Sequence, residues 1–310
     1  MKNPCPLYRA GIFFCLLCYY FSCAIIFFMK IITSDVLGFC FGVRRAVEMA
    51  QKALDENPGK PVYSLGPIIH NESVLASFEK RGLIVIDEKQ IDSIEKEAVV
   101  IIRAHGVTLS CIKKLEAKKC VIVDATCPRV KASQKMVERY TDKNDYVIIS
   151  GDKNHGEMIG IAGFAGKNFV QIQNEKDAVD LKLSDGDKIN VILMSQTTFS
   201  VNEFAKIEKV LRKKFRNIAV MNTICPATEE RQNALFNLCK KADGVLVIGG
   251  KTSANTKRLY SIASKNCKLA SHIQSADDIP DEFFKLKTVG ITAGASTPDD
   301  IIQQVIDKLS

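Results

Sequence analysis

The sequence predicts an α/β protein built from three similar units, and the main evidence is a repeated segment that carries a cysteine. Cys40, Cys127 and Cys225 each follow a short apolar run and precede a stretch with helical periodicity. In the second and third repeats, a further apolar run ends 24 residues after the cysteine, at Gly151 and Gly249. A fixed offset that recurs along a chain indicates internal duplication. Short apolar runs that alternate with helical segments are typical of parallel sheets covered by helices.

The first predicted unit covers residues 30–106 and opens with an apolar run at 31–37. The segment after Cys40 has one apolar stripe at helical spacing. The stripe consists of Val43, Ala46, Val47, Ala50 and Leu54. A later apolar run at 98–103 ends in a polar turn that contains His105. The unit is therefore expected to contain strands at both runs and a helix directly after the cysteine.

The second and third predicted units, 107–199 and 200–310, repeat this order of elements. Expected strands at 121–124 and 218–221 precede Cys127 and Cys225, and expected strands at 190–194 and 288–291 each end in a polar turn. The last helix is predicted to open with Ser296, Thr297 and Pro298, which supply an N-cap and a first-turn proline. It should pack back on the first unit, which lacks a preceding helix of its own.

Polar residues occupy matching positions at the predicted strand ends, where parallel α/β units bind ligands. They are His70, His105, His155, Thr197, Ser253 and Ser296. His155 and Ser253 both lie 28 residues after the cysteine of their unit. Any one of these residues is a common turn residue, but matching offsets in three units favour one shared site. The fourth histidine, His272, has no equivalent in the repeats and is expected to play no part in it.

Three thiolates from three equivalent units predict one soft-metal site with an open coordination position. The cysteines lie 87 and 98 residues apart, unlike the close pairs of structural zinc sites and ferredoxins. Wide spacing suits a 4Fe-4S cluster with one iron not held by the protein. The other cysteines of the globular region, Cys111, Cys120, Cys239 and Cys267, are expected to be small buried hydrophobes. Irregular spacing predicts that the eleven cysteines are reduced rather than paired in disulfides.

A phosphate group could bind where the third unit begins its second helix. The turn from Gly249 to Thr252 is rich in glycine, and Ser253 and Asn255 follow at the expected helix start. Backbone N–H groups and hydroxyls at such a start bind phosphate, although Val245 breaks the P-loop pattern. With the three histidines, these residues could hold a diphosphate. Glu157 is a candidate proton donor beside them, or simply a favourable first-turn acid of a helix.

The remaining features concern charge and the first 29 residues. The formal net charge of +8 comes from scattered basic residues, which favours a solvated surface over nucleic-acid binding and suits an anionic substrate.

Residues 1–29 form a hydrophobic leader without a charge from Ala10 to Met29. Two interpretations stay open: translation begins at Met29, or residues 1–28 form a membrane anchor of about 20 apolar residues. Contact with a membrane is expected only in the second case.

The chain resembles the LytB family of 4-hydroxy-3-methylbut-2-enyl diphosphate reductases from about Met29 to Ser310. The shared motifs are GFCFGVRRA, GPIIHN, RAHGV, DATCP, His155-x-Glu157, SQTT, ICPAT with ERQ, TSAN and TAGAS. The resemblance implies a trefoil of three α/β units around a central iron–sulfur cluster. It also implies a cytoplasmic iron–sulfur oxidoreductase of isoprenoid biosynthesis. Such an enzyme converts its diphosphate substrate to isopentenyl and dimethylallyl diphosphates, the last step of the methylerythritol phosphate pathway.

The same resemblance implies roles for individual residues. Three irons of one 4Fe-4S cluster per chain would be held by Cys40, Cys127 and Cys225, and the fourth would bind the substrate's hydroxyl. The diphosphate would be bound by His70, His105, His155, Ser253, Asn255 and Ser296. Glu157 would relay protons, and Thr197 would help to bind and position the hydroxyl. An external low-potential donor of the ferredoxin or flavodoxin type would supply two electrons.

One departure from the family motif affects the expected diphosphate site. The family usually has Ser-Ser-Asn where this chain has Ser253-Ala254-Asn255, so one hydroxyl donor is missing. A hydrogen bond to a charged group contributes about 1.5–3 kcal/mol, and weaker binding of the diphosphate is therefore expected.

Three other classes of function were compared with this one. A hydro-lyase with a three-cysteine 4Fe-4S cluster, acting on a phosphorylated substrate, is the alternative enzyme and would consume no electrons. A radical enzyme that uses S-adenosylmethionine is disfavoured because the chain has no Cys-x3-Cys-x2-Cys motif. A basic RNA-binding protein would be colourless, and its affinity would fall steeply with salt.

Overall fold

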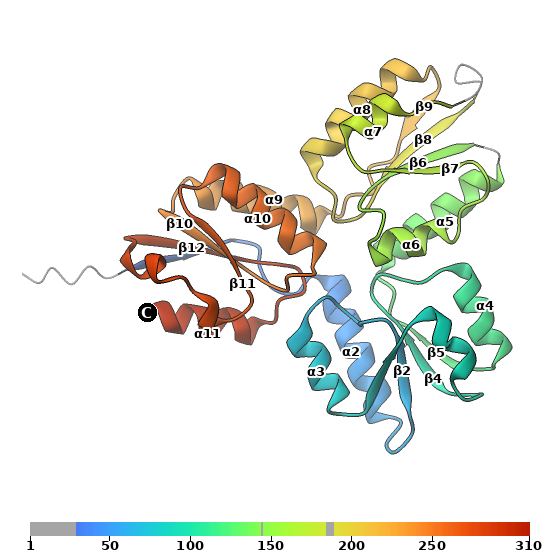
Figure 1. The fold of residues 1–310 in the computed structure, drawn as a ribbon, viewed down its shortest axis with the longest axis horizontal. Helices are drawn as coiled ribbons and strands as arrows, with labels where there is room; N and C mark the ends of the chain where they lie inside the picture. Colours follow the sequence, from blue (N-terminus) through green and yellow to red (C-terminus); the bar gives the residue numbers. More distant parts are fainter. Residues whose placement is uncertain (1–28, 144, 184–188) are drawn as a thin grey trace, which may run out of the picture.

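The computed structural model describes residues 29–143, 145–183 and 189–310. These residues form three lobes, each a four-stranded parallel sheet with helices on both faces, and the lobes meet at the centre of the molecule (Figure 1). The predicted α/β class with three equivalent units is confirmed. The hydrophobic leader lies outside the described residues, apart from Met29. Within the described part of the chain, every helix is too short or too polar to cross a bilayer.

The first lobe has the strand order β3-β2-β4-β5. Its strands are β2 (Val62–Leu65), β3 (Leu83–Ile86), β4 (Val99–Ile102) and β5 (Val121–Asp124). Its helices are α2 (Phe41–Asp55), α3 (Glu72–Glu79), the 3-10 helix η1 (Glu88–Ser93) and α4 (Leu109–Ala117). Helices α2 and α3 cover one face of the sheet, and α4 and η1 cover the other. Ala46, Ala50 and Leu54 of the predicted apolar stripe are buried against the sheet.

The second lobe repeats this arrangement with the strand order β7-β6-β8-β9. Its strands are β6 (Tyr146–Ser150), β7 (Phe169–Ile172), β8 (Val191–Ser195) and β9 (Ile218–Val220). Its helices are α5 (Pro128–Asp142), α6 (Gly156–Ala162), α7 (Glu175–Asp180) and α8 (Val201–Lys214). Helices α5 and α6 pack on one face, and α7 and α8 pack on the other.

The third lobe has the strand order β1-β12-β10-β11. Its strands are β1 (Lys30–Thr33), β10 (Gly244–Ile248), β11 (Ala270–Ile273) and β12 (Thr288–Ala293). Its helices are α9 (Pro226–Cys239), α10 (Ala254–Asn266), the 3-10 helices η2 (Ala276–Asp278) and η3 (Asp281–Lys285), and α11 (Asp299–Leu309). Helices α9 and α10 cover one face, and α11 covers the other, where it packs in one core with Ile31 and Leu37.

Each of the three cysteines of the repeat lies where the chain passes from one lobe to the next. Strand β1 pairs with β12 of the third lobe, and the chain then passes Cys40 into α2 of the first. In the same way, Cys127 connects β5 with α5, and Cys225 connects β9 with α9. The first and second sheets therefore contain strands from both sides of residues 106 and 199, where the sequence analysis divides the chain into units. That division into units stays a prediction. This exchange of strands brings the three cysteine segments to the junction of the lobes.

Two local predictions were wrong. Helix α11 begins at Asp299 with Pro298 as its N-cap, so Ser296 lies in the preceding loop and does not cap the helix. Cys239 and Cys267 form a disulfide, whereas reduced thiols were expected. Their Cα atoms lie 5.1 Å apart because α9 packs against α10, and this distance suits a disulfide. Packing of the two helices, and not the spacing of the cysteines in the chain, produces the pair.

Candidate functional site

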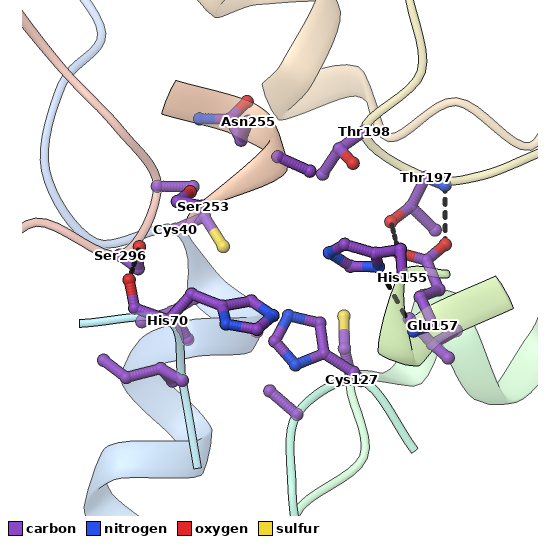
Figure 2. Close-up of a pocket in the computed structure, with 18 residues that line it drawn as sticks. Cys40, His70, Cys127, His155, Glu157, Thr197, Thr198, Ser253, Asn255 and Ser296 are labelled. Atoms are coloured by element: carbon purple, nitrogen blue, oxygen red, sulfur yellow. Dashed lines mark hydrogen bonds between the residues drawn. The ribbon is translucent and has the colours of Figure 1, made fainter. Parts of the chain in front are cut away.

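A cavity at the junction of the three lobes collects nearly all of the predicted site residues (Figure 2). Those that line it are Cys40, His70, His105, Cys127, His155, Glu157, Thr197, Ser253, Asn255 and Ser296. Cys225 is the one predicted site residue that does not line it. His272 lies apart on β11, where its Nε2 is 2.9 Å from the carbonyl oxygen of Gly249. The repeat offsets therefore predicted which polar residues meet.

The three cysteines occupy equivalent backbone positions. Each is the N-cap residue of a helix, and none of the thiols accepts a capping hydrogen bond. Each backbone N–H donates to a carbonyl oxygen in the turn after a third strand. The acceptors are Ala295 for Cys40 at 3.1 Å, Ala104 for Cys127 at 2.9 Å, and Thr197 for Cys225 at 2.8 Å. Cys225 thus repeats the local geometry of the two cysteines that reach the cavity.

The surroundings of these thiols suit negative charge. A helix N-terminus stabilises a thiolate through the helix dipole. Burial raises the pKa of the Cys127 thiol, but the backbone N–H groups of Arg129 and Val130 act in the opposite direction and favour the thiolate. Arg231 is buried beside Cys40 and Cys225, and its guanidinium donates to the carbonyl oxygens of Gly38 and Ala293. A buried guanidinium needs a nearby negative charge, which thiolates bound to a metal would supply.

Two glycines allow the lobes to approach closely around the cavity. A Cβ atom at Gly42, in the first turn of α2, would lie 2.6 Å from the Sγ atom of Cys127. A Cβ atom at Gly250, in the turn before α10, would lie 2.8 Å from the carbonyl oxygen of His70. Real Cβ atoms do not come so close to other heavy atoms, so a larger residue at either position would push the lobes apart.

Three histidines from two lobes form a compact ring. The ring centroids lie 4.5 Å apart for His70 and His105, 5.1 Å for His105 and His155, and 5.4 Å for His70 and His155. Burial lowers the pKa of all three and brings that of His155 to about 4. His155 caps α6, and its Nδ1 accepts a hydrogen bond from the Glu157 N–H. The three imidazoles are therefore neutral near pH 7.

A ring of neutral imidazoles could bind either a metal ion or an anion. The ligand nitrogens lie within 4.8 Å of one another, which is close to what a metal ion requires. Arg103 lies near the ring and its positive charge lowers the pKa of all three histidines. It forms no salt bridge with any described residue, and its Nε donates to the Gly106 carbonyl oxygen at 3.3 Å. This positive charge repels a cation and favours an anion.

The polar atoms around the cavity fit an anion with several oxygens. Four buried atoms on residues that line the cavity have no hydrogen-bond partner within the described protein. They are His70 Nε2, His105 Nδ1, Thr198 Oγ1 and Asn255 Nδ2. Because an unpaired buried polar atom is costly, the cavity is built to receive a polar ligand. Thr198, next to the predicted Thr197, is a lining residue that the repeat offsets did not indicate.

The two serine hydroxyls of the third lobe differ in whether they already donate a hydrogen bond within the protein. Ser253 caps α10 by accepting a hydrogen bond from the Thr256 N–H, so its own proton stays available. Ser296 already donates to the carbonyl oxygen of His70 at 3.1 Å and would have to turn before it could donate to a ligand. Ala254 lines the cavity between Ser253 and Asn255 and contributes no donor there.

Glu157 is placed to exchange a proton near neutral pH. The side chain is buried, and its two oxygens accept hydrogen bonds from Thr197, from the N–H at 2.6 Å and from the hydroxyl at 2.8 Å (Figure 2). Burial raises the pKa of the carboxyl to about 7, although the bonds from Thr197 and the charge of Arg258 pull it down. A group with this pKa holds a proton in part of the molecules at pH 7 and can donate it.

Sequence reasoning missed a group of buried charges around the cavity. Arg103 and Arg231 lie within the RAHGV and ERQ motifs, but nothing in their spacing indicated a role. Arg258 pairs with Asp152 at 3.1 Å and stacks on the ring of Phe199, with 4.9 Å to the centroid. Asp152 is close enough to Glu157 and to His155 to raise the pKa of each, so a second carboxylate lies near the histidines. Arg231 lies three, four and seven residues before Ala234, Leu235 and Leu238, and a charge on that apolar helix face is the signal that could have indicated it.

Comparisons with known proteins find similar sequences over most of the chain. A model of the LytB protein family matches residues 31–310. The 4-hydroxy-3-methylbut-2-enyl diphosphate reductase of Treponema denticola is 43% identical over 287 residues, which cover 91% of this chain and 99% of that protein. The protein of the same name from Caldanaerobacter subterraneus is 41% identical, with 91% and 96% covered.

Two solved structures are also similar. The E-1-hydroxy-2-methyl-but-2-enyl-4-diphosphate reductase of Plasmodium falciparum superposes with a TM-score of 0.85 at 29% identity, over 90% of this chain and 87% of that one. A second structure, whose title describes the terminal enzyme of the non-mevalonate pathway, superposes with a TM-score of 0.66 at 35% identity, over 91% of this chain and 99% of that one. The similarities span the same region as the motifs.

Proposed function

Because this chain belongs to the LytB family, we propose that it reduces 4-hydroxy-3-methylbut-2-enyl diphosphate to isopentenyl and dimethylallyl diphosphates. This is the last step of the methylerythritol phosphate route to isoprenoids. The observation that carries the proposal is one cavity that combines a histidine and hydroxyl ring for an anion, a buried carboxyl with a pKa of about 7, and two cysteine thiols. The substrate has the matching parts, a diphosphate and a hydroxyl to be removed.

The proposed cofactor is a 4Fe-4S cluster held by Cys40, Cys127 and Cys225. Three free thiols at equivalent helix N-termini fit this group, and Arg231 lies beside two of them. Three sulfur ligands, with no fourth free cysteine lining the cavity among the described residues, suit a cluster with one iron open to substrate. When bound, such a cluster would supply two electrons and a Lewis-acidic position for the hydroxyl.

The chain's own residues then have separate tasks. The diphosphate would be bound by His70, His105, His155, Ser253, Asn255 and Ser296, and Arg103 would favour its negative charge from behind the ring. Thr197 holds Glu157 in place through two hydrogen bonds, and Glu157 would donate a proton to the departing hydroxyl. The C–O bond breaks, the hydroxyl leaves as water, and two electrons and two protons enter for each substrate.

The electrons must come from an external low-potential donor of the ferredoxin or flavodoxin type, and we expect the enzyme to work in the cytoplasm. Consumption of reductant separates this function from the hydro-lyase alternative. Anaerobically reconstituted protein should oxidise about two equivalents of methyl viologen radical for each substrate converted. Conversion of substrate to a hydrated or dehydrated product without loss of the radical would reject the reductase in favour of the hydro-lyase.

The pH dependence of turnover should report the protonation of Glu157. A general acid works in its protonated form, so turnover should fall as the pH rises through about 7. Thr197→Val removes a hydroxyl that stabilises the carboxylate and lowers its pKa. The pKa of Glu157 should then rise, and the alkaline limb of the profile should move to higher pH.

Thr198→Val is the matched control for this prediction. Thr198 lines the same cavity, but its hydroxyl makes no hydrogen bond to Glu157. The substitution should raise KM and leave the alkaline limb where it is. If Thr197→Val left the limb unmoved, or if Thr198→Val moved it equally, turnover would not be limited by the proton of Glu157.

A further inference from the structure

Phe41 is the most exposed large hydrophobic side chain of the described residues, with 74% of its surface accessible. It directly follows Cys40 and is the first residue of α2. It does not line the cavity. A single exposed hydrophobic residue is ordinary on a protein surface, so its position and its neighbours decide what it means.

Phe41 lies over the junction of the segments that carry Cys40 and Cys127. The first turn of α2 lies against Cys127, since Gly42 approaches its Sγ atom so closely. One turn later, Arg45 donates to the carbonyl oxygens of Thr126 at 3.2 Å and Asp124 at 3.3 Å. Phe41 is therefore an exposed aromatic ring at the surface next to two proposed ligands of the cluster.

Basic side chains follow the two cysteine segments on α2 and α5. Arg44 lies three residues after Phe41 on α2, and Arg129 lies two residues after Cys127. Arg45, Lys131 and Lys135 line one hollow. Two acids lie among them: Asp124 pairs with Lys131, and Asp299 lies 3.9 Å from Arg44. Arg129 and Lys135 are exposed and form no salt bridge with any described residue. This part of the molecule therefore combines an exposed aromatic ring with mainly basic side chains. We call Phe41 and the five basic residues together the Phe41 surface.

We propose that the Phe41 surface is the docking site for the electron donor, a small acidic protein with a one-electron centre near its surface. The proposal rests on the proposed function, which requires such a donor. An aromatic residue at the centre and charge at the rim are typical of protein interfaces. Interfaces for electron transfer are small and depend on opposite charge to guide the encounter. Because Phe41 lies outside the cavity, the donor could bind without obstructing the substrate.

The charge also argues against a second copy of this chain as the occupant. A symmetric dimer through the Phe41 surface would place two basic rims against each other, and like charges at an interface are costly. Glu229 and Glu230 are exposed near the start of α9, directly after the third cysteine segment. The residues near the third cysteine are thus acidic, whereas those on α2 and α5 are mainly basic. This difference would orient an acidic partner toward Cys40 and Cys127.

The test compares two reductants on the reconstituted enzyme. Phe41→Ala and Arg129→Glu should each lower kcat/KM for reduced ferredoxin by about tenfold. Turnover with methyl viologen radical, which needs no docking surface, and the iron content should stay at the wild-type values. Higher salt should slow the ferredoxin reaction of the wild type and have less effect on Arg129→Glu.

Phe284→Ala and Lys213→Glu are the matched controls. Phe284 is 43% exposed in η3, and Lys213 is exposed at the end of α8, so neither belongs to the Phe41 surface. The docking site is rejected if the Phe41 and Arg129 variants keep the wild-type rate with ferredoxin, or lose rate equally with both reductants. It is also rejected if the control variants lose as much. Turnover of the wild type with the viologen radical would leave the proposed function intact in each case.

Discussion

Replacing Cys127 with serine is expected to remove most of the bound iron and nearly all turnover. An alkoxide is a hard ligand, and it binds iron in a sulfide cluster far less well than a thiolate does. Cys127 lines the cavity at the N-terminus of α5, and no other described cysteine in its lobe could replace it. The measurements are iron and sulfide per chain, the visible spectrum, and turnover after anaerobic reconstitution.

The same result is expected for Cys40→Ser and Cys225→Ser. Cys225 is the more informative of the two, since it shares the backbone geometry of the others without lining the cavity. Cys120→Ser is the matched control: Cys120 is also free and half-buried, but it precedes β5 whereas Cys127 follows it. Loss of iron from the Cys120 variant, with iron retained by the Cys127 variant, would show that the repeats were aligned incorrectly.

Glu157→Gln should lower turnover by about 10²–10⁴, the usual effect of removing a general acid. The glutamine has the same size, and its carbonyl oxygen can still accept the hydrogen bond from the Thr197 N–H. The Thr197 hydroxyl, which donates to Glu157, can turn and accept from the new amide. Iron content and substrate affinity should therefore stay near the wild-type values, because only the transferable proton has been removed.

Asp152→Asn provides the comparison for Glu157. Asp152 is the other carboxylate near the histidines, but it is partly exposed and pairs with Arg258. Its replacement should cost far less turnover. Near-normal turnover of Glu157→Gln would mean that protons arrive by another route, such as His155 or the substrate's own diphosphate.

The sequence predicted which residues form the site better than it predicted how the strands pair. Matching offsets identified Cys40, Cys127 and Cys225, because duplication places equivalent residues at equivalent strand ends. They could not show that β1 joins the sheet of β12, since that pairing links Lys30 with Thr288 across the whole chain and leaves no local signal. The sequence analysis also did not predict the edge strands β3, β7 and β11, and β7 and β11 carry polar residues that break the apolar pattern.

Buried charges were the other part that the sequence could not supply. Arg103 looks like any polar residue at the end of a strand until the fold places it beside three histidines. The pKa of Glu157 likewise depends on burial and on Thr197, which lies 40 residues away in the chain. Such effects come from contacts between segments that are far apart in the chain, both within a lobe and between lobes, and the spacing of residues does not indicate them.

The central claim is that three cysteines from three lobes hold one iron–sulfur cluster beside an anion-binding cavity. The most direct measurement is the iron and sulfide content and the visible spectrum of the full chain, purified without oxygen and reconstituted. The account predicts a brown protein with about four iron and about four sulfide ions per chain. A colourless protein without iron after reconstitution would contradict it.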